Sequence, residues 1–338
     1  MNGENILVIR HAGLGDMLLT LSAVAPIKRK NPDSRLYFLV NRPMIPLLGC
    51  FDFTAGTVEY ARGAAAVARM VAEIRKLKID RVINFERAFK KSLISLASGG
   101  RSRTGFNSIE LAPFLTERVP DLKDNPSFHM RDRYFQLTKN IGLDGYDILL
   151  PFRPDRGSRD RVEEFLSRNG VSGSDFLVGL NPVTGFPSKY WFNDRWARVA
   201  DYLIGEKKAK LIITFGPEPG QKETAMDVMG RMRERAILSF DTSLVEFGAL
   251  IGSFSLFLCL DSGPFHFAVS QGIPTISLWG RGNLAQWGPQ VEGHVTIQKD
   301  VDCSPCALYE CDHRTCMQEI TAEDVIEKID VWCSENSE

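Results

Sequence analysis

The chain has 338 residues, of which 44% are hydrophobic and 25% charged, a composition typical of a globular protein long enough for two domains. Lys plus Arg (41) almost equals Asp plus Glu (42), so no global charge draws the chain to nucleic acid. No apolar run approaches the ~20 residues that cross a bilayer, and the N-terminus lacks a signal-peptide core. We therefore expect a cytoplasmic protein, with peripheral membrane contact left open.

Strand and helix patterns alternate through the first half, which is typical of a doubly wound parallel sheet. Between the first strand and the first helix lies the turn His11-Ala12-Gly13-Leu14-Gly15-Asp16. Its GxGD pattern lacks the third glycine of the dinucleotide-binding GxGxxG motif. The sequence predicts strands at 5–10, 36–40 and 81–85, and helices at 17–30, 64–77, 89–97 and 128–141.

A proline-containing segment, 142–157, is the expected linker, and the alternation restarts after it. We expect an N-terminal domain at 1–150, a C-terminal domain at 151–320 and a last helix within 321–338. Two doubly wound, Rossmann-like domains in tandem predict a central cleft faced by the carboxyl ends of both sets of strands. The later strands are predicted at 176–181, 211–215, 255–260 and 274–278, and the helices at 159–169, 191–204, 221–233, 244–251, 265–271 and 321–333.

The stretch Leu258–Trp279 organises the second half. A buried-type strand ends in Asp261-Ser262-Gly263-Pro264, a helix follows, and Gly272 ends that helix before the next strand. A glycine turn that leads into a helix N-terminus is suited to bind an anion. The alternative is an ordinary βαβ turn in which Asp261 caps the helix.

Two turn residues are candidates for catalysis. Asp16, after Gly15, could take a proton from a hydroxyl, or it could serve only as a helix N-cap. Lys189, in the turn after the strand 176–181, could hold a phosphate, or it could be an ordinary solvated lysine.

Other turn residues are weaker candidates. Glu218 and Glu223 flank a Gly-Pro turn and could accept hydrogen bonds from ribose, although glutamate is common at helix starts. His266 lies one turn into the helix after Gly263, where a packed histidine is the alternative. Asp300-Val301-Asp302 is the only Asp-x-Asp in the chain, and we interpret it as a turn rather than a metal clamp.

The seven cysteines are an odd number, which argues against a secreted disulfide scaffold. Four of them could bind a structural zinc ion, but only one CxxC pair is present. Free thiols, or a local disulfide, are the alternative. These four are Cys303, Cys306, Cys311 and Cys316.

Nearly the whole chain resembles the ADP-heptose:lipopolysaccharide heptosyltransferases of glycosyltransferase family 9, which have the GT-B fold. The resemblance rests on ILVIRHAGLGDMLLTLSA, GLNPVTGFPSKYW, FGPEPGQKE and LDSGPFHFAVSQGIPTISLWG, and on the cysteine-rich tail that ends in Cys316-Met317. The chain departs from the family's usual G-x-T-D-P after the last strand, where it has Gly280-Arg281-Gly282-Asn283-Leu284.

The resemblance implies roles for these residues. Asp16 would be the general base, beside an acceptor-side turn that contains Gly13 and Gly15, and Lys189 would bind the donor phosphate. The last helix would pack back on the N-terminal domain. The nucleotide-sugar donor would be bound by Thr184, Lys189, Glu218, Glu223, Asp261, Ser262, Gly263 and His266.

The sequence thus predicts an inverting, metal-independent glycosyltransferase of the α/β, GT-B class that needs no cofactor. It would move heptose from a nucleotide-diphospho-sugar, ADP-heptose, to a lipopolysaccharide-core or glycolipid acceptor. One rival function is a sugar-nucleotide epimerase or hydrolase on the same scaffold. The other is a nucleotide-sugar-binding protein without catalysis.

Overall fold

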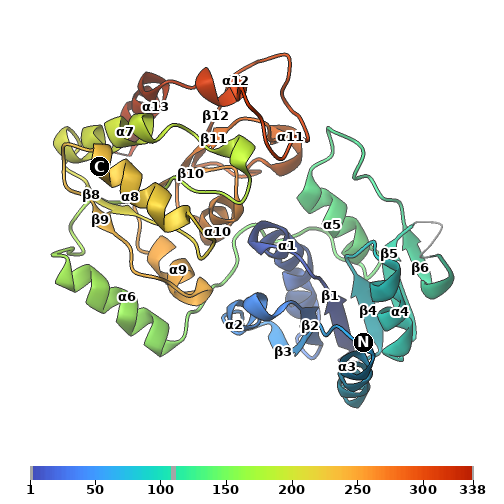
Figure 1. Cartoon of the computed structure of the whole chain (residues 1–338). Coiled ribbons are helices and arrows are strands. Elements are labelled where there is room, and N and C mark those ends of the chain that lie inside the picture. Colours follow the sequence, from blue (N-terminus) through green and yellow to red (C-terminus); the bar gives the residue numbers. More distant parts are fainter. Residues whose placement is uncertain (1–2, 108–111, 337–338) are drawn as a thin grey trace. The chain divides into compact units, whose positions relative to one another are not determined.

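The computed structural model describes residues 3–107 and 112–336. It divides the chain into two compact units, an N-terminal unit, Met1–Arg153, and a C-terminal unit, Pro154–Glu338 (Figure 1). The boundary falls inside the segment 142–157. Each unit has its own parallel sheet covered by helices on both faces, so the predicted doubly wound, Rossmann-like α/β class is confirmed.

The N-terminal unit is built on a six-stranded sheet in the order β3-β2-β1-β4-β5-β6, and all of its strand pairs are parallel. The chain runs outward from β1 to β2 and β3 on one side, and then returns to β4 on the other. The order therefore reverses between β1 and β4. The strands are β1 (Asn5–Ile9), β2 (Arg35–Val40), β3 (Thr54–Glu59), β4 (Arg81–Asn84), β5 (Ser102–Phe106) and β6 (Glu117–Val119).

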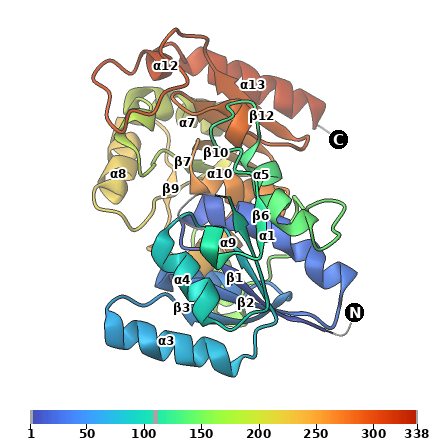
Figure 2. The same cartoon turned by 90° about the vertical axis from the view of Figure 1, so that its right-hand side faces the viewer.

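Helices cover both faces of this sheet (Figure 2). The longest helix, α1, packs against α5 on one face. On the other face α3 and α4 supply Met70, Ile74 and Ile94 to a core shared with Leu7 and Ile9 of β1. The helices are α1 (Leu14–Lys30), α2 (Ile45–Leu48), α3 (Ala64–Lys76), α4 (Phe89–Ala97) and α5 (Met130–Lys139), with short 3₁₀ turns at Arg42–Met44 and Ala112–Phe114.

The C-terminal unit repeats this plan with the strand order β12-β11-β10-β7-β8-β9 and parallel pairing throughout. Its order reverses between β7 and β10. All residues of β7, β10 and β11 are buried, as expected for central strands of a parallel sheet. The strands are β7 (Leu177–Asn181), β8 (Lys210–Ile213), β9 (Ile237–Leu238), β10 (Leu256–Leu260), β11 (Thr275–Trp279) and β12 (His294–Gln298).

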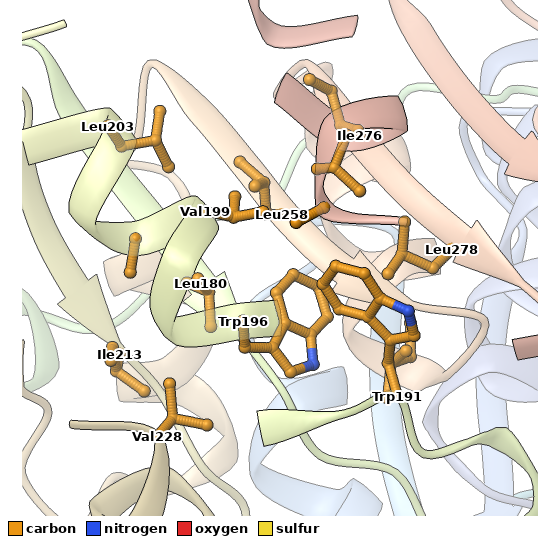
Figure 3. Close-up of a cluster of buried hydrophobic side chains, with 14 of the residues drawn as sticks. Leu180, Trp191, Trp196, Val199, Leu203, Ile213, Val228, Leu258, Ile276 and Leu278 are labelled. Atoms are coloured by element: carbon orange, nitrogen blue, oxygen red, sulfur yellow. The ribbon is translucent and has the colours of Figure 1, made fainter. Parts of the chain in front are cut away.

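Two tryptophans anchor the core on one face of this second sheet (Figure 3). The rings of Trp191 and Trp196 meet edge to face with centroids 4.8 Å apart, and Trp191 Nε1 donates to Ile320 O at 3.0 Å. The helices are α6 (Arg156–Arg168), α7 (Asn193–Gly205), α8 (Gln221–Arg231), α9 (Leu244–Ile251), α10 (Gly263–Gln271), α11 (Leu284–Trp287), α12 (Thr315–Gln318) and α13 (Ala322–Glu335), with a 3₁₀ turn at Pro187–Lys189.

The last helix, α13, differs from its prediction. Instead of returning to the N-terminal domain, it lays Val325 and Ile329 into the core of the C-terminal unit, against α7, β11 and β12. Both side chains are fully buried there. The physical reason is that this face is the helix's buried apolar stripe, and the second sheet already offers an apolar surface beside α7. Thr321 and Asp324 form a capping box at the start of this helix.

The sequence missed strands with polar or half-buried patterns. In β5, SRTGF, an arginine and two hydroxyl residues interrupt the apolar run, although Thr104 and Phe106 are buried. The edge strand β12, HVTIQ, has only one buried residue. Gly272 ends α10 as predicted, with a left-handed φ of 72° that favours glycine.

Candidate active site

Each sheet has a group of polar side chains at the point where its strand order reverses. In open α/β sheets, ligands bind outside the carboxyl ends of the strands at this switch point. In the N-terminal unit, Asp16 follows β1 and Glu86 follows β4. In the C-terminal unit, Lys189 lies in the turn after β7, and Asp261 follows β10 directly.

Asp16 lies inside α1 rather than before it. The helix begins at Leu14, earlier than predicted, and its N-cap is Gly13, which makes no side-chain capping bond. Asp16 is therefore the third helical residue. The alternative that Asp16 is the N-cap is wrong, and its carboxylate is available for other contacts, while still lying in the first turn that the helix dipole makes favourable for an anion.

Two hydrogen bonds hold one oxygen of the Asp16 carboxylate. Arg10 Nη2 and the Tyr134 hydroxyl both donate to Oδ1, at 2.7 Å and 2.5 Å. Arg10 in turn donates to Phe85 O at 3.1 Å, and its guanidinium lies 4.7 Å from the Tyr134 ring centroid. Among the described residues no hydrogen-bond donor contacts Oδ2, and the Asp16 side chain is 35% exposed.

The partners of Asp16 have fixed protonation states. Burial raises the pKa of Tyr134 well above its usual value, and the nearby Asp16 carboxylate adds to this rise, so Tyr134 stays a neutral donor. Burial alone would lower the pKa of Arg10. Attraction to Tyr134, Asp16 and Glu86 outweighs burial and raises that pKa, so Arg10 stays charged.

A second carboxylate, which sequence reasoning missed, lies beside this pair. Glu86 Oε1 accepts from the backbone N–H of His11 at 2.8 Å and lies 3.6 Å from Arg10 Nη1. Its Oε2 pairs with Lys91. Glu86 thus anchors the turn between β1 and α1. Its position directly after the predicted strand 81–85 could have marked Glu86 as a candidate site residue.

Gly13 leaves one side of the turn between β1 and α1 open. A Cβ built on Gly13 would meet no atom within 4 Å, and the φ of this residue, −72°, suits any amino acid. Gly13 is therefore not required by backbone conformation. Gly15 is the second residue of α1 and directly precedes Asp16.

In the C-terminal unit, Lys189 and Asp261 form a buried ion pair. Lys189 Nζ donates to Asp261 Oδ2 at 2.6 Å and to Asp261 O at 3.0 Å. The two side chains are 16% and 8% exposed. The structure therefore brings together two residues that are 72 positions apart in the chain, and the alternative of a solvated loop lysine is wrong.

The turn after β11 closes over the same carboxylate. A Cβ on Gly282 would lie 2.1 Å from Asp261 Oδ2, so only glycine allows this backbone to approach so closely. Ser262 is the N-cap of α10 and makes no side-chain cap bond, while Gly263 and Pro264 begin the helix. The first backbone N–H groups of α10 consequently lie beside the Lys189–Asp261 pair, and Asp261 itself is not the helix cap.

Thr184 and His266 are buried near these turns. Thr184 O accepts from Gln221 Nε2 at 3.4 Å, and Gln221 Oε1 accepts from the backbone N–H of Gly216 at 2.9 Å. Gln221, which the sequence did not single out, therefore ties the turn after β7 to the turn after β8. The His266 ring packs edge-on to Phe265 and Trp287.

The two candidate glutamates lie apart from this cluster. Glu218 and Glu223 are exposed, and within residues 3–107 and 112–336 neither side chain makes a hydrogen bond or ion pair with Lys189 or Asp261. Glu223 lies in the first turn of α8, where an acidic residue stabilises the helix dipole.

The cysteine-rich segment is not assembled into a metal site. In the described part of the chain no three His, Cys, Asp or Glu side chains are arranged to hold a metal ion, and all four candidate cysteines are free thiols. Burial and the neighbouring thiols of Cys303, Cys306 and Cys311 raise the pKa of the Cys316 thiol.

Two consecutive Rossmann-like units, each with a polar cluster at its switch point, define the GT-B class of glycosyltransferases. Residues 67–316 match the family model of glycosyltransferase family 9 (heptosyltransferase). The chain belongs to this family, as its motifs indicated. Within the described residues, no helix is long and apolar enough to cross a membrane.

Relatives with known names agree with this assignment. The chain is 24% identical to lipopolysaccharide heptosyltransferase 3 of Escherichia coli K12 over 92% of its length and 93% of that protein. It superimposes on a family 9 glycosyltransferase from Veillonella parvula with a TM-score of 0.85, at 22% identity and 99% coverage of both chains. For E. coli ADP-heptose lipopolysaccharide heptosyltransferase II the TM-score is 0.81, at 17% identity and 99% and 100% coverage.

Proposed function

We propose that this protein is an inverting heptosyltransferase that acts on a lipopolysaccharide inner-core acceptor with ADP-heptose as the donor. The observation that carries the proposal is the Asp16 carboxylate, with one oxygen fixed by Arg10 and Tyr134 and the other open, at the switch point of the first sheet. Its similarity to lipopolysaccharide heptosyltransferase 3 and to ADP-heptose lipopolysaccharide heptosyltransferase II supports the substrate class.

On the acceptor side, we assign proton removal to Asp16. Its free oxygen accepts the proton of the acceptor hydroxyl while that hydroxyl oxygen bonds to the anomeric carbon of the heptose. The bond from this carbon to the diphosphate oxygen breaks in the same displacement, and its electron pair leaves with the nucleoside diphosphate. A single displacement from the opposite face inverts the anomeric configuration. Arg10 and Tyr134 keep the carboxylate in one orientation throughout.

On the donor side, the leaving diphosphate needs positive charge and N–H donors. Lys189 and the first N–H groups of α10 can supply both, because a helix N-terminus favours an anion. Before the donor binds, Asp261 holds Lys189 in position. Fixed donors of this kind stabilise charge that develops in the transition state without reorganisation. The donor set therefore includes Lys189, Ser262 and Gly263, with Thr184 and His266 as supporting residues and Glu218 or Glu223 as ribose contacts.

The proposed mechanism is metal-independent, with Lys189 and the N-terminus of α10 as the groups that stabilise the diphosphate. We place the reaction in the cytoplasm, with the lipid-linked acceptor at a membrane surface. The acceptor would be held by the N-terminal unit and the donor by the C-terminal unit.

The direct test is transfer by the purified protein. The protein is incubated with ADP-heptose and a core-oligosaccharide acceptor, and mass spectrometry follows heptose addition to the acceptor. We expect transfer that survives EDTA and gives a product of inverted anomeric configuration. Epimerised or hydrolysed ADP-heptose without transfer would favour the rival enzyme, and donor binding with no turnover would favour a non-catalytic protein. Activity lost in EDTA and restored by magnesium or manganese would contradict the metal-independent mechanism.

A further inference from the structure

The polarity of α4 is the reverse of that of an ordinary surface helix. Its buried side carries Ser92 and Ser95, both fully buried, whereas Phe89, Leu93 and Leu96 are 50%, 46% and 44% exposed. A surface helix of a globular protein normally buries its apolar residues and exposes its polar ones. We call Phe89, Leu93 and Leu96 the α4 stripe.

Hydrogen bonds fix α4 in this orientation. Ser92 Oγ accepts from Asn84 Nδ2, at the end of β4, at 3.2 Å. Ser95 Oγ donates to Lys91 O at 3.2 Å, and Ile94 enters the core of the N-terminal unit. Turning the helix to bury the α4 stripe would remove Ile94 from that core and break the bond to Asn84. The exposed stripe is thus a property of the packed helix.

The α4 stripe forms one continuous apolar strip. Its residues follow the i, i+4, i+7 spacing, which places them on one face of a helix. Phe89 extends the strip beyond the helix, because its ring meets the half-buried Phe114 edge-on with centroids 5.2 Å apart. Contiguous apolar patches of this kind mark contact sites more often than isolated exposed residues do.

The surrounding segment is basic. Residues 86–107 contain five Lys or Arg and one acidic residue, Glu86, although the whole chain has a net charge of −1. Arg87 pairs with Asp121, and Lys91 pairs with Glu86. The other three basic residues are Lys90, Arg101 and Arg103. Of these, Lys90 and Arg101 are exposed and make no ion pair with any described residue.

We propose that the α4 stripe, with the exposed Lys90 in the same helix, docks on the surface of an anionic lipid bilayer. Apolar side chains on one face and basic residues at its edge are the combination that binds the boundary between headgroups and acyl chains. The excess of basic charge argues for an anionic surface. This inference deepens the proposed function, on which it rests, because a lipid-linked acceptor is presented at such a surface.

The test is co-sedimentation of the full-length protein with vesicles of phosphatidylcholine, alone or mixed with phosphatidylglycerol. We expect binding to the mixed vesicles and weak binding to phosphatidylcholine alone. Leu93→Ser combined with Leu96→Ser should weaken binding roughly tenfold or more, since two apolar anchors are lost. Lys90→Ser should weaken binding to the anionic vesicles about fivefold. Leu149→Ser is the matched control, because Leu149 is 58% exposed in the same unit and should change nothing.

Two further measurements distinguish weaker membrane binding from unfolding and from a change in self-association. Unchanged melting temperatures establish that the variants are folded, and sedimentation velocity reports self-association. The proposal is overturned if the wild type ignores anionic vesicles or if the stripe variant binds them as the wild type does. It is also overturned if the stripe variant still binds vesicles but no longer forms a dimer that the wild type forms. The α4 stripe would then contact a second copy of the chain rather than a membrane.

Failure of the docking proposal can be distinguished from failure of the proposed heptosyltransferase function. Transfer to a delipidated, soluble core acceptor should be as fast in the stripe variant as in the wild type. A protein that transfers heptose but binds no vesicles overturns only the docking surface. A protein that binds vesicles through the stripe but transfers nothing overturns the proposed function.

Discussion

The two switch-point clusters contain the same kind of ion pair but differ in which partner solvent can reach. In the N-terminal unit the cation, Arg10, is 8% exposed and the carboxylate, Asp16, is 35% exposed. In the C-terminal unit both members are largely buried, and the carboxylate, Asp261, is the less exposed at 8%. An accessible carboxylate held by a buried cation suits a base. A lysine held in place by a buried carboxylate suits the binding of an anion.

The largest expected effect separates basicity from geometry at Asp16. In Asp16→Asn the side-chain carbonyl can still accept from Arg10 and Tyr134, and the cap of α1 is unaffected because it is Gly13. The variant loses the ability to take a proton, and Arg10 loses one charge partner but keeps Glu86. We expect initial rates of heptose transfer to fall by roughly 10²–10⁴-fold, with a melting temperature that is only slightly lowered. Transfer at close to the wild-type rate would remove Asp16 from the proposed mechanism.

Lys189→Ala tests the second pair. It should weaken donor binding by roughly 10- to 100-fold, the worth of a hydrogen bond to a charged group. It should also lower the free energy of unfolding by about 3 kcal/mol, because Asp261 is left buried without its partner. Calorimetric titration and denaturant unfolding measure the two effects.

The matched control for this pair is Lys189→Ala combined with Asp261→Asn. Removing the buried charge should restore most of the unfolding free energy and leave donor binding weak. If the double variant stays as unstable as Lys189→Ala, the ion pair is not the source of the stability loss.

Tyr134→Phe should have a smaller effect on turnover. It deletes the hydrogen bond to Asp16 Oδ1 and the one that the Tyr134 hydroxyl accepts from Arg10 Nη2. The bond from Arg10 to Asp16 remains, so kcat should fall roughly 10-fold while the KM for the donor is unchanged. Steady-state kinetics separates the two constants. A change in donor KM alone would mean that Tyr134 does not act through Asp16.

The same variant should also change how folding stability depends on pH in alkali. The pKa of Tyr134 is raised in the folded protein, so above about pH 10 the unfolded chain loses the phenol proton and the folded protein keeps it. The contribution of Tyr134 to the free energy of unfolding is therefore fully present below about pH 10. It falls by about 1.4 kcal/mol per pH unit as the pH rises further. Tyr134→Phe should lack this slope in urea unfolding between neutral and alkaline pH. Identical slopes for the two proteins would contradict a buried, neutral Tyr134.

Sequence patterns predicted the parallel architecture because buried strands such as β10 and β11 read as unbroken apolar runs. They also singled out Asp16, Lys189 and Asp261, since each follows a strand in a turn. They could not supply the partners. Tyr134 lies 118 residues from Asp16, and only the packing of α5 against α1 brings its hydroxyl to the carboxylate.

Other errors have local causes. The start of α1 was predicted three residues late, because glycines at positions 13 and 15 read as a turn while the backbone there is already helical from Leu14. The resemblance implied that the last helix packs on the N-terminal domain, whereas Val325 and Ile329 of α13 lie in the core of the C-terminal unit. Amphipathic periodicity could not correct this, because it shows that a helix has a buried face but not which sheet covers it.

The central claim is a division of labour, with the base on the first unit and the diphosphate site on the second. Calorimetric titration of ADP into the wild type, Asp16→Asn and Lys189→Ala tests it directly. The account predicts that Asp16→Asn binds ADP with the wild-type Kd and that Lys189→Ala binds it roughly 10- to 100-fold more weakly. Weakened binding by Asp16→Asn, or wild-type binding by Lys189→Ala, would contradict it.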